Sequence, residues 1–169
     1  MQSKGQQGKY ALLMFQKMEA ILRELTEYFN EERYTDLVLV ALNEARGTMQ
    51  NRIFNSSEGA KDIEGRPMEN NDKSGGAYSL TWGKTRTSKG RQIKHKDFSF
   101  TGSLIHSIKV EREGDKYKIT MSDSAKANLI EKQNKKEIFS LSDEEVELFN
   151  DTFKTLLLED LQKILAKYK

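Results

Sequence analysis

The chain has 169 residues, of which 36% are hydrophobic and 32% are charged, and its formal net charge is +2. This length fits one compact domain, 1–169, and no stretch reaches the roughly 18 to 20 apolar residues that a membrane-spanning helix needs. Cysteine is absent, which excludes disulfides, thiolate nucleophiles and thiolate zinc sites.

Two amphipathic helices are predicted in the first third of the chain. From Tyr10 to Phe29, apolar residues recur every three or four positions, the spacing that lines one face of a helix. A second apolar stripe runs from Leu37 to Ile53, with Thr35 as its expected N-cap. The short link between the two helices predicts that they pack antiparallel. The first stripe consists of Leu12, Phe15, Met18, Leu22, Leu25 and Phe29.

The middle of the chain changes character. Residues 55–77 gather glycine, asparagine, aspartate and serine around the only proline, which predicts a flexible loop. Alternation at 78–82 and at 98–100 favours two short strands. The clearest strand signal lies at 108–121, where apolar residues alternate with charged ones on both sides of Glu113-Gly114-Asp115. We therefore predict a β-hairpin with one buried face.

The last third predicts helices again. A short helix is expected at 124–133, followed by an extended apolar run at 137–141. Ser142 and Glu145 have the spacing of a capping box, after which an apolar stripe continues to the C-terminus. These elements together predict an α+β fold with an N-terminal helix pair, a small antiparallel sheet with a β-hairpin, and a long C-terminal helix.

No set of residues in the sequence spells out a reaction. His95 and His106 are eleven residues apart, a spacing that matches no metal-binding motif. A group of carboxylates falls in the expected first turn of the last helix, where negative charge offsets the helix dipole, so we interpret it as structural. We expect no catalytic residue, no metal and no cofactor, and we predict that the protein is not an enzyme. The carboxylates are Asp143, Glu144, Glu145 and Glu147.

One segment stands out by its charge. Residues 84–96, here called the basic segment and expected to form a loop, carry six basic and no acidic side chains, with Trp82 and Phe98 on its flanks. Three interpretations stay open: docking on an acidic protein partner, binding of nucleic-acid phosphates, or a solvated surface loop. The candidate contact residues are Lys84, Arg86, Lys89, Arg91, Lys94 and Lys96.

Several short strings follow one another in a particular order. After the N-terminal helices come Lys89-Gly90-Arg91-Gln92, then Thr101-Gly102-Ser103-Leu104 with Ser107-Ile108, and later Ile138-Phe139-Ser140-Leu141 before the last helix. In this order the strings resemble the phage virion-morphogenesis and tail-completion proteins, over roughly residues 37 to 160. Locally, Thr101 is expected to cap a turn, Gly102 to take a backbone angle closed to other residues, and Leu104 to enter the core.

The resemblance implies a structural protein of a phage or prophage. Such a protein would form a ring-shaped homo-oligomer at the head–tail junction, with tail-tube and head-connector proteins as partners. It would be made and assembled in the cytoplasm of the bacterial host and end in the virion. In the ring, the basic segment would face an acidic neighbour or the DNA. The alternative is a small nucleic-acid-binding protein that uses residues 84–96.

Overall fold

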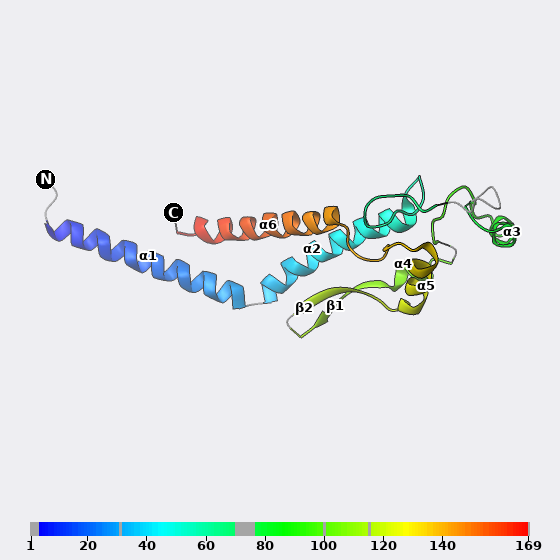
Figure 1. Cartoon of the computed structure of the whole chain (residues 1–169). Coiled ribbons are helices and arrows are strands. Elements are labelled where there is room, and N and C mark those ends of the chain that lie inside the picture. The colour runs from blue at the N-terminus through cyan, green and yellow to red at the C-terminus, as the bar shows by residue number, and fades with distance from the viewer. Residues whose placement is uncertain (1–3, 31, 70–76, 100, 115, 169) are drawn as a thin grey trace. The chain divides into compact units, whose positions relative to one another are not determined.

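The chain folds as an α+β protein in a computed structural model that describes residues 4–30, 32–69, 77–99, 101–114 and 116–168. Two N-terminal helices, a β-hairpin and a long C-terminal helix are present, which confirms the predicted class (Figure 1). In chain order the elements are α1 (Lys4–Asn30), α2 (Glu32–Gln50), the π-helix η1 (Asn51–Asn55), α3 (Leu80–Ser88), α4 (Ser103–Ser107), β1 (Ile108–Glu113), β2 (Lys116–Met121), α5 (Ser124–Asn134) and α6 (Asp143–Ala166).

The chain divides into two compact units, which we describe separately. The helical unit comprises Met1–Val40 and Asp151–Lys169, and the mixed unit comprises Ala41–Asn150. Both α2 and α6 continue from one unit into the other. A single domain for the whole chain stays a prediction.

In the helical unit, α1 lies against α6. The Tyr28 hydroxyl donates to Asp160 Oδ2 at 3.1 Å, and the Tyr168 hydroxyl donates to Glu24 Oε2 at 2.7 Å. The expected antiparallel pairing of α1 with α2 is wrong. Only one residue separates these two helices, whereas antiparallel neighbours need a loop of about two to five residues.

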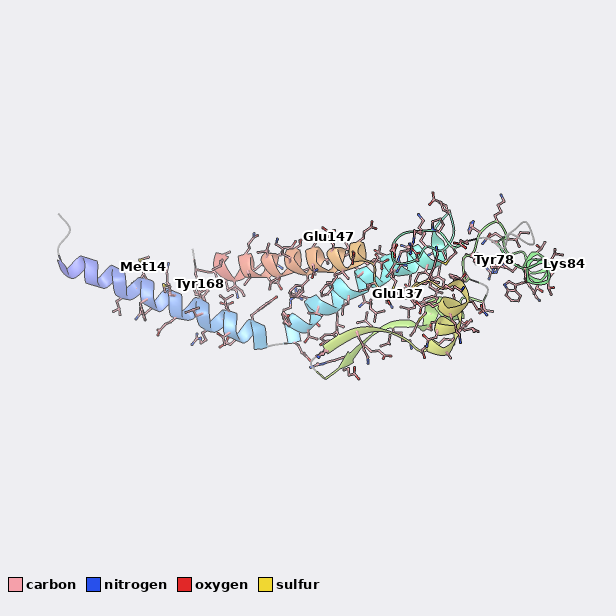
Figure 2. All side chains as sticks on the ribbon, viewed as in Figure 1. Met14, Tyr78, Lys84, Glu137, Glu147 and Tyr168 are labelled. Carbon is pink, nitrogen blue, oxygen red and sulfur yellow. The ribbon has the colours of Figure 1, made fainter. Side chains whose placement is uncertain are left out.

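The stripe that predicted α1 is not its buried face. Leu12, Phe15, Met18 and Leu22 are between 56% and 63% exposed, and Met14 is exposed as well (Figure 2). The half-buried residues of α1 lie mostly on a neighbouring side of the helix, and among the described stripe residues only Leu25 is one of them. They are Ala20, Ile21, Glu24, Leu25 and Tyr28. Phe29, the last residue of the predicted stripe, belongs to the helix, but its side chain lies outside the described part.

The second helix begins earlier than predicted. It starts at Glu32, so Thr35 lies inside the helix and is not its N-cap. The carboxylate of Glu32 stands in the first turn, where it offsets the helix dipole without a capping hydroxyl. Beyond Gln50 the helix continues as η1, which buries Ile53 and Phe54.

The core of the mixed unit is a cluster of buried apolar side chains from four separate stretches of the chain. These stretches are the end of α2 with η1, residues 60–68, the α4–β1 junction and residue 138. Burial of each of the cluster's Met, Ile, Leu and Phe side chains stabilises the fold by about 1.5–3 kcal/mol. The cluster comprises Met49, Ile53, Phe54, Ala60, Met68, Leu104, Ile108 and Ile138.

The predicted hairpin is confirmed. Strands β1 and β2 pair antiparallel, with Ile108 opposite Met121 and Val110 opposite Ile119. Ile108 is buried and the other three are half-buried, so one face of the hairpin turns toward the core. Gly114 in the turn has φ +62°, a backbone angle that glycine adopts without steric cost. Asp115 lies outside the described residues.

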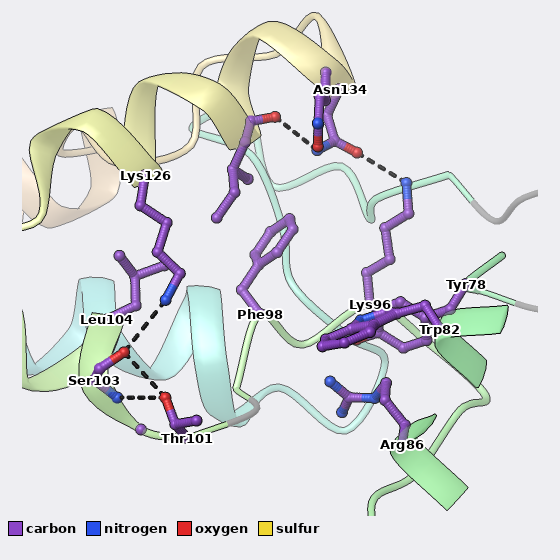
Figure 3. Close-up of a pocket in the computed structure, with 13 residues that line it drawn as sticks. Tyr78, Trp82, Arg86, Lys96, Phe98, Thr101, Ser103, Leu104, Lys126 and Asn134 are labelled. Carbon is purple, nitrogen blue, oxygen red and sulfur yellow. Dashed lines mark hydrogen bonds between the residues drawn. The ribbon is translucent and has the colours of Figure 1, made fainter. Parts of the chain in front are cut away.

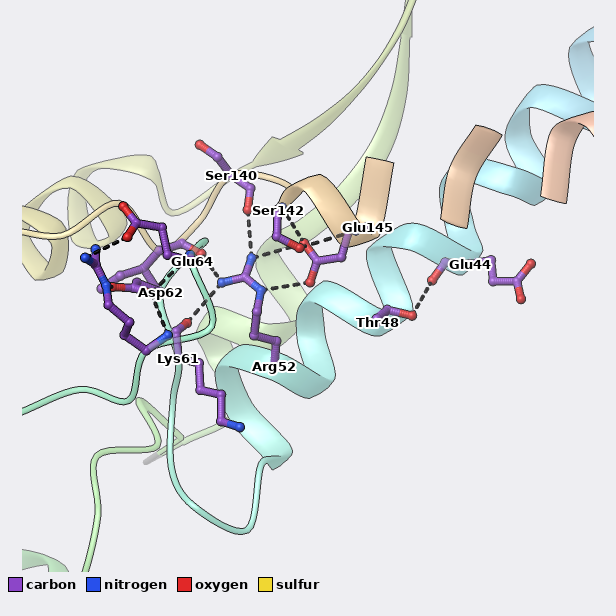
Figure 4. A network of polar contacts seen from close by, with 11 residues as sticks. Glu44, Thr48, Arg52, Lys61, Asp62, Glu64, Ser140, Ser142 and Glu145 are labelled. Carbon is purple, nitrogen blue, oxygen red and sulfur yellow. Dashed lines mark hydrogen bonds and ion pairs between the residues drawn. The ribbon is translucent and has the colours of Figure 1, made fainter. Parts of the chain in front are cut away.

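The capping box of α6 forms as the sequence predicts. The Glu145 amide donates to Ser142 Oγ at 3.3 Å, and the Ser142 amide donates to Glu145 Oε2 at 2.8 Å. Glu145 also binds the Arg52 guanidinium, with Nε 2.8 Å from Oε1 (Figure 4). The same guanidinium donates to the carbonyl oxygens of Lys61 and Ser140, at 3.0 and 2.8 Å. The acidic cluster therefore contains a structural carboxylate at its centre.

Residues 56–69 form an irregular but well-bonded segment. A single β-bridge joins Lys61 to Pro67, and the buried Asp62 accepts hydrogen bonds from the Arg66 amide at 2.8 Å and from Arg66 Nε at 2.9 Å. Burial alone would raise the pKa of Asp62, but the hydrogen bonds from Arg66 and Lys136 outweigh it and hold that pKa below its usual value. Residues 70–76 of the predicted flexible loop lie outside the described residues.

The strand predicted at 78–82 is wrong, because this stretch leads into helix α3. Tyr78, Trp82 and Arg86 are four residues apart, a spacing that puts them on one side of a helical turn and lets Arg86 be buried. Phe98 and Ser99 belong to no strand, and Phe100 lies outside the described residues. The basic segment is therefore not wholly a loop, since its first five residues are helical.

Candidate functional site

The basic segment divides into exposed and buried cations. Four of the six candidate residues are exposed: Lys84 on α3 (Figure 2), and Lys89, Arg91 and Lys94 in the irregular chain that follows. Arg86 is 1% exposed, so it is not available to a partner. Lys96 is half-buried. Of the six predicted contact residues, Arg86 is therefore not accessible to a partner, and Lys96 is only partly accessible.

Arg86 is held by Asp97, the first acidic residue after the segment. Its Nη2 lies 2.9 Å from Asp97 Oδ1 and 2.8 Å from Oδ2, and its Nε donates to the Gln92 carbonyl at 2.9 Å. The guanidinium also lies over the Tyr78 ring, 4.4 Å from its centroid. Because the charge is paired inside the fold, Arg86 shapes the segment rather than binding through it.

Asp97 collects further hydrogen bonds from the same segment. Tyr78 Oη donates to Asp97 Oδ1 at 3.0 Å, Gln92 Nε2 donates to Oδ2 at 2.6 Å, and the Ser99 amide donates to Oδ1 at 3.0 Å. Burial raises the pKa of Tyr78 to about 12, so its phenol stays protonated at neutral pH. This network fixes the path of the chain from α3 to Phe98.

The position of Lys96 is fixed by close contact between its backbone and that of residues 59–60. The Ala60 amide donates to the Lys96 carbonyl at 2.6 Å, and Gly59 has φ +96° with no room for a side chain, since a Cβ would lie 2.9 Å from that carbonyl. The ammonium of Lys96 donates to Asn134 Oδ1 on α5 at 2.8 Å. Burial lowers the pKa of Lys96 and outweighs the opposing effect of the Glu69 carboxylate.

A pocket of about 430 Å³ opens beside the basic segment, entirely within the mixed unit (Figure 3). Its described lining contains three cationic side chains, Arg86, Lys96 and Lys126, and no carboxylate. The remaining lining residues are Tyr78, Trp82, Phe98, Thr101, Gly102, Ser103, Leu104, Ile130, Gln133 and Asn134. We call this site the aromatic–lysine pocket. Its volume falls in the range of small-ligand sites.

Two aromatic rings dominate the apolar part of the pocket. Trp82 is 40% exposed although it is the largest side chain in the lining. Phe98 has φ +47°, an angle that costs a bulky residue steric energy, and its ring packs on Phe139 with centroids 6.2 Å apart. Figure 3 shows the Phe98 ring between the α5 side of the pocket and Trp82. Such an uncommon backbone angle is often retained where it positions a functional side chain.

Lys126 supplies a cation from the opposite wall. Its ammonium donates to Ser103 Oγ at 3.2 Å and lies 3.8 Å from an Asp123 carboxylate oxygen, and the side chain is 46% exposed. Ser103 Oγ also accepts a hydrogen bond from the Thr101 hydroxyl at 3.0 Å. The pocket therefore has a lysine on each side of its aromatic residues.

The sequence indicated only part of this site. Trp82 and Phe98 were noted as flanks of the basic segment, and Lys96 as a member of it. Lys126, Ser103 and Asn134 were not predicted, because they come from α4 and α5 and no local pattern connects them with residues 84–96. The one local signal that was missed is Asp97, which directly follows the basic segment and neutralises Arg86.

Across the ranges that the structure describes, no three His, Asp or Glu side chains are grouped closely enough to hold a metal ion. None of the described helices combines the length and the apolar character that a membrane crossing requires.

Comparison with protein-family models, with curated proteins and with solved structures found no match to this chain.

Proposed function

We propose that this protein is a structural, non-enzymatic subunit of phage tail completion or head–tail joining, which acts by self-assembly and by contacts with tail-tube and head-connector proteins. It would be made in the cytoplasm of the bacterial host, encoded by a phage or prophage, and become part of the virion. The proposal rests on the resemblance of the sequence strings and on one surface of the molecule.

That surface is the exposed apolar face of α1. Leu12, Phe15, Met18 and Leu22 repeat at helical spacing and are all more than half exposed. Soluble monomers rarely leave a contiguous apolar patch of more than a few hundred Å² in water. A helical face of this kind is typical of a surface that becomes buried on assembly, and it is the observation that best supports the proposal.

The charges beside this face favour a second copy of the chain as the occupant. Gln16, Glu19, Ala20 and Arg23 line a hollow along the same helix. Glu19 and Arg23 are one turn apart, so two antiparallel copies of α1 related by a two-fold axis would place each Glu19 opposite the other copy's Arg23. In this register Leu22 of each copy lies between the two charge pairs, whereas Met18, Phe15 and Leu12 extend beyond them along the other copy's helix.

The geometry around Gly102 agrees with the local roles expected of one of the strings that carry the resemblance. Gly102 has φ +79°, Thr101 Oγ1 accepts from the Ser103 amide at 3.4 Å, and Leu104 is 2% exposed. The string therefore makes a left-handed turn that starts α4 and directs Leu104 into the core. This role explains the residue types without assigning a partner.

The experiment is the solution mass by light scattering across protein concentration, with Leu22→Lys compared against Leu129→Lys. Both leucines are exposed on helices, at 60% and 54%, but Leu129 belongs to α5 of the mixed unit and is not part of the α1 face. We expect the wild type and Leu129→Lys to form a discrete oligomer and Leu22→Lys to shift toward monomer. A wild-type protein that stays monomeric at every concentration would contradict self-assembly.

The alternative function is nucleic-acid binding through the basic segment. Lys84, Lys89, Arg91 and Lys94 remain exposed, and no acidic residue lies between them. Binding of this kind weakens steeply with salt because counterions are released. Charge reversal at Lys89 and Arg91 tests it, whereas the same change at Arg86 would break a buried ion pair. A mass increase with duplex DNA at low salt that these reversals abolish would favour the alternative.

A further inference from the structure

The aromatic–lysine pocket has features that assembly through α1 does not use. It combines an exposed tryptophan, a second aromatic ring and two lysines, and its described lining contains no carboxylate. We propose that this pocket binds one nucleotide unit of a single-stranded nucleic acid, with the base on Trp82 and the flanking phosphates at Lys96 and Lys126. The proposal is independent of whether the protein forms rings.

The electrostatics of the pocket favour an anion. Its described lining has three cations, and Arg86 is neutralised by Asp97, which leaves Lys96 and Lys126. Lys96 is half-buried, and within the described residues its ammonium has an amide oxygen as its hydrogen-bond partner and no carboxylate at ion-pair distance. The Glu69 carboxylate acts on this ammonium only from beyond ion-pair distance, so a phosphate oxygen could still pair with it directly. Lys126 also contacts Asp123, but it is 46% exposed and can reach a second acceptor.

The aromatic residues favour a base as the other half of the ligand. Base-on-aromatic stacking is the common device of proteins that bind single strands, because every base offers a flat face. Trp82 lies on α3, where Tyr78 and Arg86 hold the adjoining turn in place. Phe98 stands across from it on a backbone angle that its neighbours must enforce. The rings are thus held in place before any ligand arrives.

The shape of the site selects a single strand over a duplex. A base inside a paired helix is stacked on both faces and cannot enter a concave pocket without being flipped out. A single strand offers unstacked bases at no such cost. Beyond the pocket, the exposed Lys84, Lys89, Arg91 and Lys94 continue along the same stretch of chain and could follow the rest of the phosphate backbone.

The test uses the fact that Trp82 is the only tryptophan in the chain, so its fluorescence reports on this pocket alone. We expect oligo(dT) of about ten nucleotides to quench that fluorescence at low salt, and the matching duplex to quench it far less. In Lys126→Gln the affinity should fall roughly tenfold, and the log–log dependence on salt should be shallower by about 0.7, the loss of one phosphate contact.

Lys109→Gln is the matched control, because Lys109 is an exposed lysine on β1 that does not line the pocket. It should bind like the wild type, and circular dichroism should show that both variants are folded. Absence of quenching at low salt, equal binding by Lys126→Gln, or equal quenching by duplex would each overturn the proposal. Quenching by an acidic peptide alone would instead assign the pocket to a protein partner. None of these fluorescence measurements depends on the mass of the oligomer, so the test is separate from that of self-assembly.

Discussion

Arg52 shows how one side chain can connect distant parts of the chain. Its guanidinium pairs with Glu145 and donates to the carbonyl oxygens of Lys61, Ile138 and Ser140, all at 2.8–3.1 Å. The side chains of Arg52 and Glu145 are only 10% and 2% exposed. A buried ion pair is costly to desolvate, so it adds little net stability. Removing one partner is nevertheless strongly destabilising, because the other charge stays buried without compensation.

We therefore expect Arg52→Met to lower the free energy of unfolding by about 3–5 kcal/mol, because it leaves the Glu145 carboxylate buried without its partner. The measurement is urea denaturation at neutral pH. The double variant Arg52→Met, Glu145→Gln should recover part of the loss, since no uncompensated charge remains. Equal stability of the single and double variants would show that the lost carbonyl hydrogen bonds, not the stranded charge, account for the effect.

Arg86 differs from the other cations of the basic segment in its burial. By sequence it is one of six cations without an acid between them, but in the fold it is the only one of the six that is fully buried. The reason is its spacing from Tyr78 and Trp82 on one helical side, together with Asp97 eleven residues ahead. Charge counts along a sequence do not distinguish a cation that binds a partner from one that holds the fold.

At the scale of elements, the contact between α1 and α6 depends on Asp160. This buried carboxylate accepts from Arg33 Nε at 2.8 Å, from Lys163 Nζ at 2.7 Å and from the Tyr28 hydroxyl at 3.1 Å. The hydrogen bonds from Arg33 and Lys163 hold the pKa of Asp160 well below its usual value. Burial raises the pKa of Tyr28 to about 12, with Asp160 adding to the shift.

This arrangement predicts a loss of stability in acid. Because the folded-state pKa of Asp160 lies below its unfolded value of about 3.9, its contribution is fully present above that pH and is lost as the pH falls toward the folded-state pKa. Asp160→Asn should cost about 2 kcal/mol at pH 7 and show a flatter decline between pH 5 and 3. Urea unfolding from pH 7 to pH 3 measures the stability cost at neutral pH and the decline in acid. A variant whose acid decline matches the wild type would assign the decline to other carboxylates.

The sequence pattern of α1 correctly predicts a helix, but it does not show which side of that helix is buried. The three-and-four periodicity of Leu12, Phe15, Met18 and Leu22 shows only that they share a face. Whether that face is covered depends on what lies next to it, and α6 contacts another side of the helix. By contrast, the hairpin and the α6 cap were predicted correctly, because each is specified by residues a few positions apart.

At the scale of the whole molecule, burial is unevenly distributed. Most of the buried apolar residues belong to the mixed unit, whereas the described residues of the helical unit contribute Leu37 and Ile164. Local opening costs least where few apolar contacts must be broken. We infer that α1 is among the less protected helices of an isolated chain.

Amide hydrogen exchange tests whether α1 is weakly protected in the isolated chain and whether assembly protects it. In dilute protein, the amides of α1 from residue 12 to 28 should exchange faster than those of η1. As the protein concentration rises, α1 should gain protection, because association stabilises the surface that it covers. The amides near Gly114 at the hairpin turn serve as the control and should not change. Oligomers that form without protecting α1 would mean that another surface drives assembly.

The sequence by itself determined α1, α2, α5, α6, the hairpin, the capping box of α6 and the left-handed turn at Gly102. Each is set by backbone angles, periodicity or hydrogen bonds among residues close together in the chain. Only the tertiary structure decided that Arg86 is buried, that the α1 stripe is exposed, and that Lys126 stands across a pocket from Trp82. These outcomes depend on packing between segments tens of residues apart, because the burial of a side chain is set by every segment that packs around it.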